Sequence, residues 1–285
     1  MIQPKSAVTH HFTVDVEEYF QVSALEPWVP RARWGSFESR VVHSTLRLSR
    51  LLNDHDSRAT FFVLGWVAER EPELIRKLAA AGHEIASHGW DHRRVTEQNR
   101  SEFRASVRRT KQLLEDLTGT PVIGFRAPSF SIVPGLEWAL DILIDEGYQY
   151  DSSLFPVMRR GYGYARGRRD PHWLMRPGGA LAEIPPATVR RMGVNFPAAG
   201  GAYLRLLPVG LVRTALLDSD RRGVPATFYI HPWEIDPDQP RVATSWPTRF
   251  RHYGGLARTA NRLVRLLQEF RFQPIAKTIA ALPRD

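Results

Sequence analysis

The chain has 285 residues, of which 43% are hydrophobic and 24% are charged. This composition is typical of a globular protein and excludes a collagen-like chain or a wholly disordered one. The sequence contains no cysteine, which excludes disulfide scaffolds, thiolate zinc sites, iron–sulfur clusters and cysteine nucleophiles. The formal net charge of +9 indicates either anionic partners or simply the arginine usage of a GC-rich genome.

Short runs of β-forming residues alternate with longer helical patterns along the chain. The predicted strands are residues 11–16, 59–64, 83–86, 122–125, 148–150, 181–184, 226–230 and 270–275. The predicted helices are residues 36–52, 67–81, 96–118, 134–146, 208–222 and 254–270. Alternation sustained over this length is typical of an α/β protein with a parallel sheet, which is either a closed barrel or a doubly wound sheet.

Two stretches interrupt this alternation. Residues 159–177 are rich in arginine, glycine and aromatic side chains, and residues 185–208 contain three glycines. Both are predicted to be long loops, of the kind that are functional or mobile in compact α/β proteins. No linker composition divides the chain, so we expect a single domain over residues 1–285 that is decorated by these loops.

Segments that direct a chain to a membrane are recognised by long apolar stretches. Residues 1–20 contain one lysine and no apolar stretch of the length found in secretory signals. No window approaches the roughly 18 uninterrupted apolar residues of a membrane span, so we expect a cytoplasmic protein. Residues 203–217 are a candidate contact with the inner face of the membrane, although a helix packed on the barrel is the simpler interpretation.

Polar side chains that can support chemistry follow five of the predicted strands. They are Asp15, Glu17 and Glu18 at the end of the first strand, His88 and His92 after the third, Arg126 after the fourth, Asp151 after the fifth, and His231 after the seventh. In a parallel barrel or sheet, the carboxyl ends of the strands share one edge, where active sites are built. The sequence therefore predicts that these groups converge on one site.

His88 and His92 are four residues apart, so on a helical turn their imidazoles would project from the same face. Two such histidines and one carboxylate form a common site for a divalent metal, with positions left open for water and substrate. Alternation along the first strand puts Asp15 and Glu17 on one face and Glu18 on the other. One acid would ligate the metal while another takes a proton from water. The alternative is that all of these residues are solvated residues of turns.

Three further residues extend the predicted site. The Arg126 guanidinium is suited to hold a carboxylate such as Asp15 by paired hydrogen bonds, as a positioning group or as a structural ion pair. His231 is either a general acid suited to neutral pH or a neutral core histidine with one hydrogen-bond partner. Asp151 would orient His231 or line the site, unless it is a plain turn residue.

Four motifs, in this order, resemble those of the polysaccharide deacetylases of carbohydrate esterase family 4, the group built on the NodB homology domain. They are Thr13-Val14-Asp15-Val16-Glu17, His88-Gly89-Trp90-Asp91-His92, Arg126-Ala127-Pro128-Ser129-Phe130 and Tyr229-Ile230-His231. The resemblance covers residues 10–235, and residues 236–285 would complete the fold with helix and strand. Residues 15–22, 150–156 and 228–234 look most like the subgroup found in exopolysaccharide gene clusters of the exosortase type.

This resemblance implies a deformed (β/α) barrel of seven or eight strands and a divalent metal, most often zinc, with cobalt, nickel or iron as alternatives. It implies that Asp15 is the catalytic base, that Arg126 orients Asp15, and that His231 is the catalytic acid. The implied metal ligands are Glu17, His88 and His92. The usual second aspartate of the first motif is displaced and replaced here, so Glu18 is the alternative to Glu17. We prefer Glu17 because it shares the face of Asp15.

The implied reaction removes N-acetyl groups from N-acetylhexosamine units of an exopolysaccharide or of its lipid-linked oligosaccharide precursor. Phe130 stands where the family usually has tyrosine, and this position would contribute a backbone N–H to the oxyanion. The expected substrate contacts are Phe130, Asp151, Trp233 and Trp90. A sugar substrate is also favoured by the aromatic side chains of the loops, which are Trp28, Trp34, Trp90, Tyr162, Tyr164 and Trp173. We expect no nucleic-acid partner, although residues 159–169 interleave arginine, glycine and tyrosine as some RNA-binding segments do.

Three other functions would use similar residues. A hydrolase of cyclic amides on the same barrel would need the same metal and the same acids. An iron(II) oxygenase also uses two histidines and a carboxylate, but it leaves Asp15, Arg126 and His231 without a role. A glycan-binding protein with a degenerate site would not need to retain every candidate acid, base and ligand. The deacetylase is therefore the preferred hypothesis.

Overall fold

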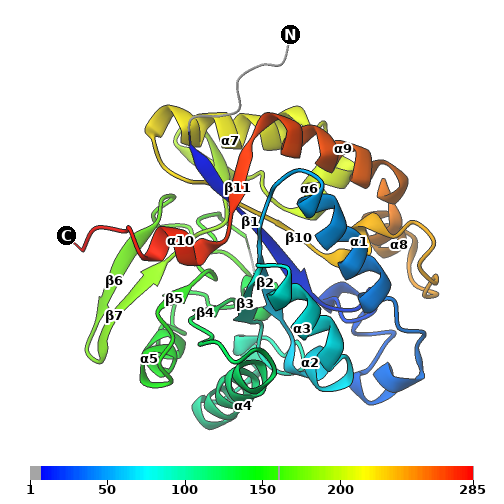
Figure 1. Ribbon diagram of the computed structural model, residues 1–285, viewed down its shortest axis with the longest axis horizontal. Coiled ribbons are helices and arrows are strands. Elements are labelled where there is room, and N and C mark those ends of the chain that lie inside the picture. The colour runs from blue at the N-terminus through cyan, green and yellow to red at the C-terminus, as the bar shows by residue number, and fades with distance from the viewer. Residues whose placement is uncertain (1–7, 160, 285) are drawn as a thin grey trace.

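All eight predicted strands form, and they belong to one sheet (Figure 1). The computed structural model describes residues 8–159 and 161–284. The strands are β1 Thr9–Val16, β2 Thr60–Val63, β3 Glu84–Ser87, β4 Gly124–Phe125, β5 Tyr150–Asp151, β6 His172–Arg176, β7 Gly179–Glu183, β8 Thr188–Arg191, β9 Val194–Pro197, β10 Thr227–Ile230 and β11 Arg271–Gln273. The helices are α1 Val41–Asn53, α2 Gly65–Arg70, α3 Pro72–Ala80, α4 Arg100–Thr118, α5 Trp138–Asp145, α6 Gly201–Leu206, α7 Gly210–Arg222, α8 Trp246–Tyr253, α9 Leu256–Glu269 and α10 Ile275–Ile279. The 3₁₀ helices are η1 Ser23–Leu25, η2 Arg31–Ser36, η3 Val95–Glu97, η4 Pro128–Phe130 and η5 Pro232–Ile235.

Seven parallel strands form a deformed barrel. Their order is β10-β1-β2-β3-β4-β5-β7, and each neighbouring pair is parallel. The ring closes where Pro186, just after β7, pairs with Thr227 of β10 through a single parallel bridge. β4 and β5 are only two residues long, so the barrel is distorted on that side. The predicted (β/α) barrel of seven or eight strands is confirmed.

The outer surface of the barrel is covered by helices (Figure 1). Each long helix presents one apolar face to the strands, because its buried residues recur every three or four positions. In α9 these residues are Leu256, Thr259, Leu263, Leu266 and Leu267. Leu263, Leu266 and Leu267 meet outward-facing strand residues such as Phe12 and Phe228 in one large apolar cluster. The core therefore lies between the strands and the helices.

The C-terminal segment closes the amino-terminal end of the barrel. β11 pairs with the first residues of β1, and α10 begins beside the starts of β2 and β3. There the N–H of Ile275 donates to the side chain of Thr60, and the N–H of Ala276 donates to the carboxylate of Glu84. The Ile275 side chain packs with Phe62 inside the barrel. Since this end is closed, a ligand enters from the opposite, carboxyl end of the strands.

The two predicted long loops contain regular structure, so that prediction is wrong in part. Residues 159–177 include β6, which pairs antiparallel with β7 at the edge of the sheet. Residues 185–208 include the β8–β9 hairpin and α6. The hairpin turn consists of Met192 and Gly193, both at positive φ, and it lacks the Asn-Gly or Asp-Gly signal that marks such turns in a sequence. Arg160 lies outside the described residues.

Two predicted helices differ from the observed ones in extent. The helix predicted over residues 36–52 begins at Val41, after a 3₁₀ helix. The one predicted over residues 67–81 is divided into α2 and α3 at Pro72, whose ring lacks the N–H that a continuous helix needs. Residues 203–217 form parts of α6 and α7, which bury apolar side chains against the barrel.

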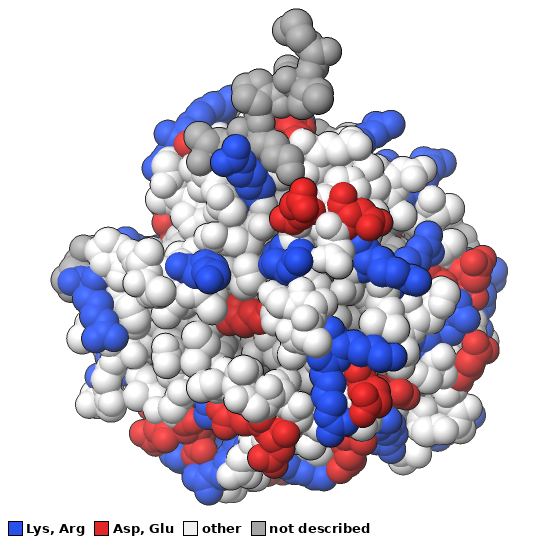
Figure 2. All heavy atoms as spheres, in the orientation of Figure 1, with Lys and Arg blue, Asp and Glu red and all other residues white. Residues whose placement is uncertain are grey.

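Charges of both signs are mixed over the surface. On the face seen in Figure 1, basic and acidic side chains are interspersed, and no continuous basic surface forms (Figure 2). Arg104 of α4, for example, pairs with Asp145 and Glu146 of α5. This face therefore lacks the basic track that nucleic-acid binding requires. Within residues 8–159 and 161–284, no helix is long and apolar enough to span a bilayer.

Candidate active site

The carboxyl ends of the barrel strands open into a cavity of about 340 Å³. Its lining includes Asp15, Glu17, His88, His92 and His231. β1 ends at Val16, β3 at Ser87 and β10 at Ile230, so each of these side chains lies at the end of its strand or just beyond it. The parallel barrel thus brings together groups that are up to 216 residues apart in the chain, such as Glu17 and the segment that follows β10.

Glu17, His88 and His92 form a group that fits a divalent metal ion. Their ligand atoms all lie within 4.8 Å of one another, and all three side chains are buried. Nε2 of His92 lies 2.8 Å from Oε2 of Glu17, yet Oε2 makes no hydrogen bond of acceptable geometry. A buried carboxylate oxygen without a hydrogen bond is costly unless a cation compensates it. One carboxylate and two imidazoles are the donor set that zinc and related ions prefer.

The protonation of two of these side chains suits metal binding. Nδ1 of His88 lies 2.8 Å from the carbonyl oxygen of Arg126, so it carries the proton and leaves the lone pair on Nε2. Burial lowers the pKa of His88 to about 4, so its ring is neutral at neutral pH. Burial alone would raise the pKa of Glu17, but its interactions with the imidazoles of His92 and His231 lower it to about 2. The site therefore offers a neutral imidazole and an ionised carboxylate.

The loop that carries both histidines is not the helical turn that their spacing predicted. Residues 88–92 are irregular, with φ of +74° at Gly89 and +56° at His92. The two imidazole rings nevertheless meet, with their centroids 5.7 Å apart. The prediction that the two rings share a site was thus right for a wrong local reason, because left-handed backbone rather than helical periodicity brings them together.

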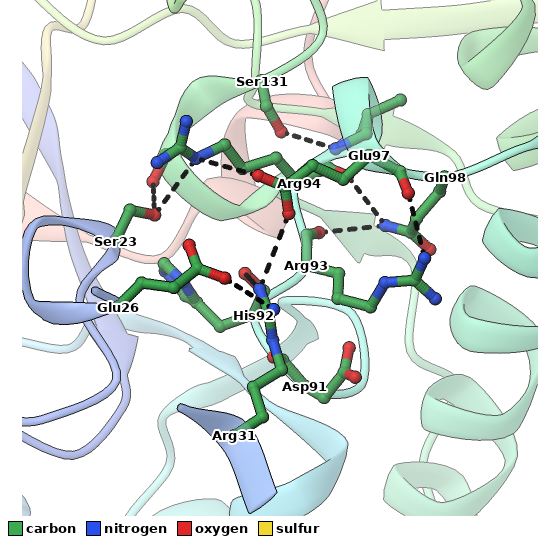
Figure 3. A network of polar contacts seen from close by, with 12 residues as sticks. Ser23, Glu26, Arg31, Asp91, His92, Arg93, Arg94, Glu97, Gln98 and Ser131 are labelled. Carbon is green, nitrogen blue, oxygen red and sulfur yellow. Dashed lines mark hydrogen bonds and ion pairs between the residues drawn. The ribbon is translucent and has the colours of Figure 1, made fainter. Parts of the chain in front are cut away.

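An arginine from the N-terminal segment holds this loop in place (Figure 3). Arg31 donates from Nε to the carbonyl oxygen of Asp91 at 3.0 Å and from Nη2 to that of His92 at 3.4 Å. Its Nη1 pairs with Glu26 at 2.6 Å, which keeps the guanidinium oriented. Arg31 was not predicted from the sequence, because an arginine that acts on backbone carbonyls leaves no motif.

Left-handed backbone recurs around the cavity. His92, Ser129 and Phe130 all line it and have φ of 56°, 55° and 53°. Such conformations cost about 1–3 kcal/mol each and persist where surrounding contacts impose them, often at functional sites. One such contact joins Oγ of Ser129 to Oγ of Ser23 at 2.8 Å. The N–H of Phe130 donates to the carbonyl oxygen of Ala127 at 3.0 Å. That a backbone N–H near Phe130 holds an oxyanion stays a prediction.

Asp15 is held by Arg126, as the sequence predicted. Nη1 of Arg126 donates to Oδ1 of Asp15 at 2.7 Å and to Oγ1 of Thr13 at 2.8 Å. Nη2 donates to Oγ of Ser152 at 2.9 Å. The guanidinium is fully buried and lies 4.1 Å from the centroid of the Phe62 ring. These contacts fix one carboxylate oxygen of Asp15 and supply the opposite charge that a buried acid requires.

His231 is oriented by a buried ion pair. Its Nδ1 lies 3.0 Å from Oε2 of Glu234, whose Oε1 accepts from Nε of Arg205 at 2.6 Å. Nε2 of His231 lies 4.0 Å from Oδ2 of Asp15 and 3.5 Å from Oε1 of Glu17. Burial alone would lower the pKa of His231, but the carboxylates of Glu17, Glu234 and Asp15 raise it to about 9. The ring is therefore protonated at neutral pH when no cation is present beside Glu17.

Glu234 and Arg205 were both missed in the sequence. The signal for Glu234 was its place three residues after His231, since residues at that spacing meet in a short 3₁₀ helix. Room for its carboxylate depends on Gly201, where an added Cβ would overlap the carboxylate oxygens. Arg205 comes from α6, in a stretch predicted to be a loop, so its spacing carried no signal.

A column of stacked rings leads away from His231. The rings of His231 and Trp233 are stacked with centroids 5.3 Å apart, and those of Trp233 and His252 with centroids 4.3 Å apart. Nε1 of Trp233 also donates to Oε1 of Glu17 at 3.3 Å. Trp233 and Phe130, two of the predicted substrate contacts, both line the cavity.

The predicted substrate contact Asp151 does not line the cavity. It is fully buried, and its Oδ1 accepts a hydrogen bond from Ser153 at 2.6 Å. In the parallel pairing of β5 with β7, Asp151 lies beside Glu183. The partner of the Asp151 carboxylate is Ser153, whereas Nδ1 of His231 meets Glu234, so Glu234 rather than Asp151 orients His231.

The predicted contact Trp90 also lies away from the cavity lining. Its ring packs over Gly65, where an added Cβ would lie within 2.3 Å of the ring. The guanidinium of Arg109 covers the ring at 3.3 Å from its centroid. Of the other loop aromatics, Tyr162 lines the cavity, whereas Trp34 is buried in a separate apolar cluster and Trp28, Tyr164 and Trp173 are not part of the lining.

The choice between the two neighbouring glutamates follows from their surroundings. Glu18 points away from the histidines and accepts hydrogen bonds from the Ser39 hydroxyl at 2.5 Å and the Arg40 N–H at 3.0 Å. Glu17 faces His88 and His92. The strand alternation that favoured Glu17 agrees with this arrangement.

Comparison with protein families divides the chain into two regions. Residues 34–141 match the family model Polysaccharide deacetylase. Residues 152–280 match a second model, described as a domain of unknown function (DUF3473). The first region includes His88, His92 and Arg126, and the second includes His231. Asp15 and Glu17 precede both.

Curated relatives match part of the chain. A peptidoglycan-N-acetylglucosamine deacetylase of Bacillus cereus is 33% identical over 32% of this chain and 33% of its own length. The peptidoglycan-N-acetylglucosamine deacetylase PgdA of Listeria monocytogenes is 30% identical over 44% of this chain and 30% of its own length. The chain thus spans about a third of these relatives. The similarity to polysaccharide deacetylases, by the family model and by these relatives, thus covers part of this chain.

Solved structures share the fold over nearly the whole chain. A Mycobacterium smegmatis protein assigned as a polysaccharide deacetylase is 20% identical, with a TM-score of 0.66, and the match covers 98% of this chain and 91% of that one. The allantoinase Puue is 16% identical, with a TM-score of 0.63, over 99% of this chain and 94% of that one. At these identities the likeness establishes the fold alone, which is a (β/α) barrel.

Proposed function

We propose that this protein is a metal-dependent hydrolase that removes the N-acetyl group from N-acetylhexosamine units of a glycan. The observation that carries the proposal is that one cavity unites the candidate metal-binding group with the carboxylate of Asp15 and the imidazole of His231. The match of residues 34–141 to the polysaccharide deacetylases supports the same reaction.

Glu17, His88 and His92 would hold the ion, since their donor set and burial fit it. When bound, a divalent ion supplies Lewis acidity toward the acetamide carbonyl and lowers the pKa of water. Zinc is the ion that we propose, with cobalt, nickel and iron(II) as alternatives that accept the same donors.

Asp15 would act as the general base. Its Oδ1 is occupied by Arg126, while its Oδ2 is the oxygen on the side of His231. As the oxygen of water bonds to the acetamide carbon, Oδ2 takes the proton of that water. The fixed guanidinium keeps the carboxylate from rotating, so the proton acceptor stays in place.

His231 would act as the general acid. Its Nε2 faces the two acids of β1, and its Nδ1 is held by Glu234. As the C–N bond breaks, Nε2 donates its proton to the departing nitrogen, which leaves as the free amine of the sugar. The acetyl group leaves as acetate, and no covalent intermediate with the protein is required.

The natural substrate that we propose is an exopolysaccharide or its lipid-linked precursor, modified on the cytoplasmic side of the membrane. Residues 150–156 and 228–234 support this choice, because they resemble the deacetylases of exosortase-type clusters and lie within or beside the region matched by the domain of unknown function.

A cyclic-amide hydrolase is the second candidate. The observation that favours it is the fold shared with an allantoinase over nearly the full length of both chains. Such a reaction needs the same ligands, base and acid, so the residues of the cavity do not separate the two functions.

The deciding experiment measures acetate release from N-acetylglucosamine oligomers in the presence of zinc, for the wild type and Asp15→Asn. Ring opening of allantoin is measured in parallel. Acetate release by the wild type that is lost in Asp15→Asn supports the deacetylase and its base. Ring opening without acetate release replaces it by the cyclic-amide hydrolase. If the protein binds the glycan but catalyses neither reaction, the site is degenerate. If the wild type and Asp15→Asn release acetate equally, Asp15 is not the base.

A further inference from the structure

The carboxylates that line the cavity all have partners. Among the described residues, they are Asp15, Glu17 and Glu234. Asp15 pairs with Arg126 at 2.7 Å. Glu234 pairs with Arg205 at 2.6 Å. Glu17 belongs to the candidate metal-binding group. The described part of the lining therefore holds no acid that is left over to balance a further cation.

Arg251 of α8 is a further cation of the cavity. It belongs to the lining, and its exposed side chain forms no ion pair or hydrogen bond with any described residue. The other arginines of the lining are paired, since Arg205 belongs to the ion pair above and Arg94 lies 3.7 Å from Glu97 (Figure 3). Within the described lining, the guanidinium of Arg251 is therefore left without an acidic partner.

A second arginine without an acidic partner lies near the same place. Burial and the neighbouring Tyr162 raise the pKa of the Tyr203 hydroxyl, while the charges of Arg159 and Arg251 act to lower it. Both guanidinium groups therefore lie within electrostatic range of this hydroxyl, and Tyr203 itself lines the cavity. Arg159 is exposed and forms no ion pair with a described residue. Two like charges near one hydroxyl repel each other, and an anion beside them would offset this repulsion.

The residue after Arg251 has an unmet polar requirement of its own. His252 lines the cavity and is 4% exposed, and its Nε2 makes no hydrogen bond with the described residues. Burial lowers the pKa of His252 to about 3, so the ring is neutral and has one donor and one acceptor nitrogen. A buried polar atom without a partner is unfavourable. This side of the cavity therefore suits an occupant that carries both negative charge and hydroxyl groups.

We propose that Arg251, together with Arg159 and the Tyr203 hydroxyl, binds an oxyanion carried by the glycan while an N-acetyl group of the same glycan lies at the candidate metal site. The proposal rests on the proposed function and sharpens it, because it makes the substrate an acidic glycan. Guanidinium groups bind carboxylate and phosphate through paired, charge-assisted hydrogen bonds, and the phenol adds one donor. The oxyanion is the carboxylate of a neighbouring uronic acid or a phosphate of a lipid-linked precursor.

The alternative is that Arg251 contacts only water, as most arginines on protein surfaces do. Arg249 of the same helix is such a residue, because it is exposed and is not part of the cavity lining. Arg249 is therefore the matched control. Replacing the side chain of Arg251 leaves the nearby ion pair in place, since Arg205 donates to the backbone carbonyl oxygen of Arg251 at 3.0 Å.

The test measures kcat/KM of the zinc-loaded protein for two matched pairs of probes. A hyaluronan tetrasaccharide, which carries carboxylates, is compared with the tetramer of N-acetylglucosamine, and UDP-N-acetylglucosamine, which carries phosphates, with N-acetylglucosamine. We expect the wild type to prefer the acidic member of one pair by about tenfold or more, and Arg251→Ala to lower this preference by about 10- to 100-fold, mainly through KM. Arg251→Lys should recover part of the loss, because lysine keeps the charge but not the paired donors. Arg249→Ala should behave as the wild type.

The preference within each pair decides the outcome. Preference for hyaluronan identifies the oxyanion as a carboxylate, and preference for UDP-N-acetylglucosamine identifies it as a phosphate. A wild type that prefers the neutral member of both pairs would overturn the proposal, as would an unchanged preference in Arg251→Ala. An equal loss on all four probes would also overturn it, because Arg251 would then support the site as a whole. The same holds for an equal loss of preference in Arg249→Ala, since the effect would then belong to the general charge of α8.

A binding measurement separates this proposal from the proposed function. If the wild type releases no acetate from any probe, the proposed function fails, and calorimetric titration with the hyaluronan tetrasaccharide and with UDP-N-acetylglucosamine tests the oxyanion site by itself. Affinity for one of them that falls by about tenfold or more in Arg251→Ala, but not in Arg249→Ala, then supports the site. Equal affinity in the wild type and Arg251→Ala, or no binding of either probe, overturns it.

Discussion

The candidate cavity has two walls that are built in different ways. The first wall comes from residues 15–131 and carries the metal-binding group and Asp15. Its side chains are positioned largely through the backbone, as where the carbonyl of Arg126 holds His88 and the guanidinium of Arg31 holds the carbonyls of the histidine loop. The second wall comes from residues 161–252 and positions His231 by side chains, namely an ion pair and a column of stacked rings.

This difference indicates how the two regions share the chemistry. The first wall orients the candidate metal ligands through contacts to backbone groups, as at His88 and the carbonyls held by Arg31, and such contacts tune a metal site. The second wall supplies His231 and the column of stacked rings, and both lie in the region matched by a domain of unknown function. Under the proposed function, that region completes the site by adding the acid.

The largest expected effect comes from the acids of the first wall. Asp15→Asn removes the proton acceptor but leaves Arg126 a partner, so we expect kcat to fall by about 10³-fold while zinc affinity stays near that of the wild type. Glu17→Gln removes the one carboxylate of the metal-binding group, so we expect both zinc affinity and activity to be lost. Calorimetric titration of the metal-free protein with zinc, together with acetate release, separates the two variants. Equal loss of zinc binding in both would mean that Asp15 is a ligand.

The next largest effect is expected when the ion pair of the second wall, between Arg205 and Glu234, is broken. Glu234→Gln leaves Arg205 buried without its counter-charge, so we expect the free energy of unfolding to fall by about 3–5 kcal/mol. We also expect kcat to fall by about 10- to 100-fold, because His231 loses the charged acceptor of its Nδ1 proton. Urea unfolding and steady-state kinetics measure the two effects.

The double variant Arg205→Met with Glu234→Gln is the control for this ion pair. It removes both charges, so we expect most of the lost stability to return while kcat stays low. If the double variant recovers its activity as well, Glu234 acts only on stability and does not position His231.

A smaller effect is expected when Arg31, which holds the loop of His88 and His92, is replaced. Arg31→Ala frees the carbonyls of Asp91 and His92, so we expect zinc affinity to fall by about 10- to 100-fold, the range found when groups that orient metal ligands are removed. Arg31→Lys should recover part of this loss. Arg33→Ala, at an exposed arginine in the same segment, is the matched control. Equal zinc affinity in the Arg31 and Arg33 variants would contradict the role of Arg31.

The smallest effect concerns two buried acids near the junction of the two matched regions. Burial raises the pKa of Asp151 to about 6, and burial together with the charge of Asp151 raises the pKa of Glu183 well above its ordinary value. Because these pKa values are higher in the folded protein than in the unfolded chain, the folded state binds more protons. Their contribution to stability is therefore fully present below about pH 4 and is lost as the pH rises through 6.

Glu183→Gln tests this pH dependence. The variant removes one of the two ionisations, so we expect its free energy of unfolding to exceed that of the wild type by roughly 1–3 kcal/mol at pH 8. The difference should shrink as the pH falls toward 4. Glu73→Gln, at an exposed position of α3, is the control. A stability difference that stays constant between pH 4 and pH 8 would rule out a shared titration of Asp151 and Glu183.

Several features of this protein could be read from local patterns. Eight of the nine strands of the sheet, the long helices between them and the convergence of Asp15, His88, Arg126 and His231 on one edge all follow from apolar runs and from the geometry of parallel strands. Alternation along β1 also separated Glu17 from Glu18. These properties depend on residues close together in the chain, so the amino-acid sequence by itself determined them.

Other features were decided only by the tertiary structure. The pairing of Glu234 with Arg205, the brace from Arg31, the burial of Asp151 and the packing of Trp90 on Gly65 all join residues whose partners lie on other elements. The loop of His88 and His92 is shaped by left-handed backbone that no helical spacing signals. The exposure and the partners of a side chain are set by what packs against it. The sequence therefore predicted the reactive groups of the cavity, but not the contacts that orient them.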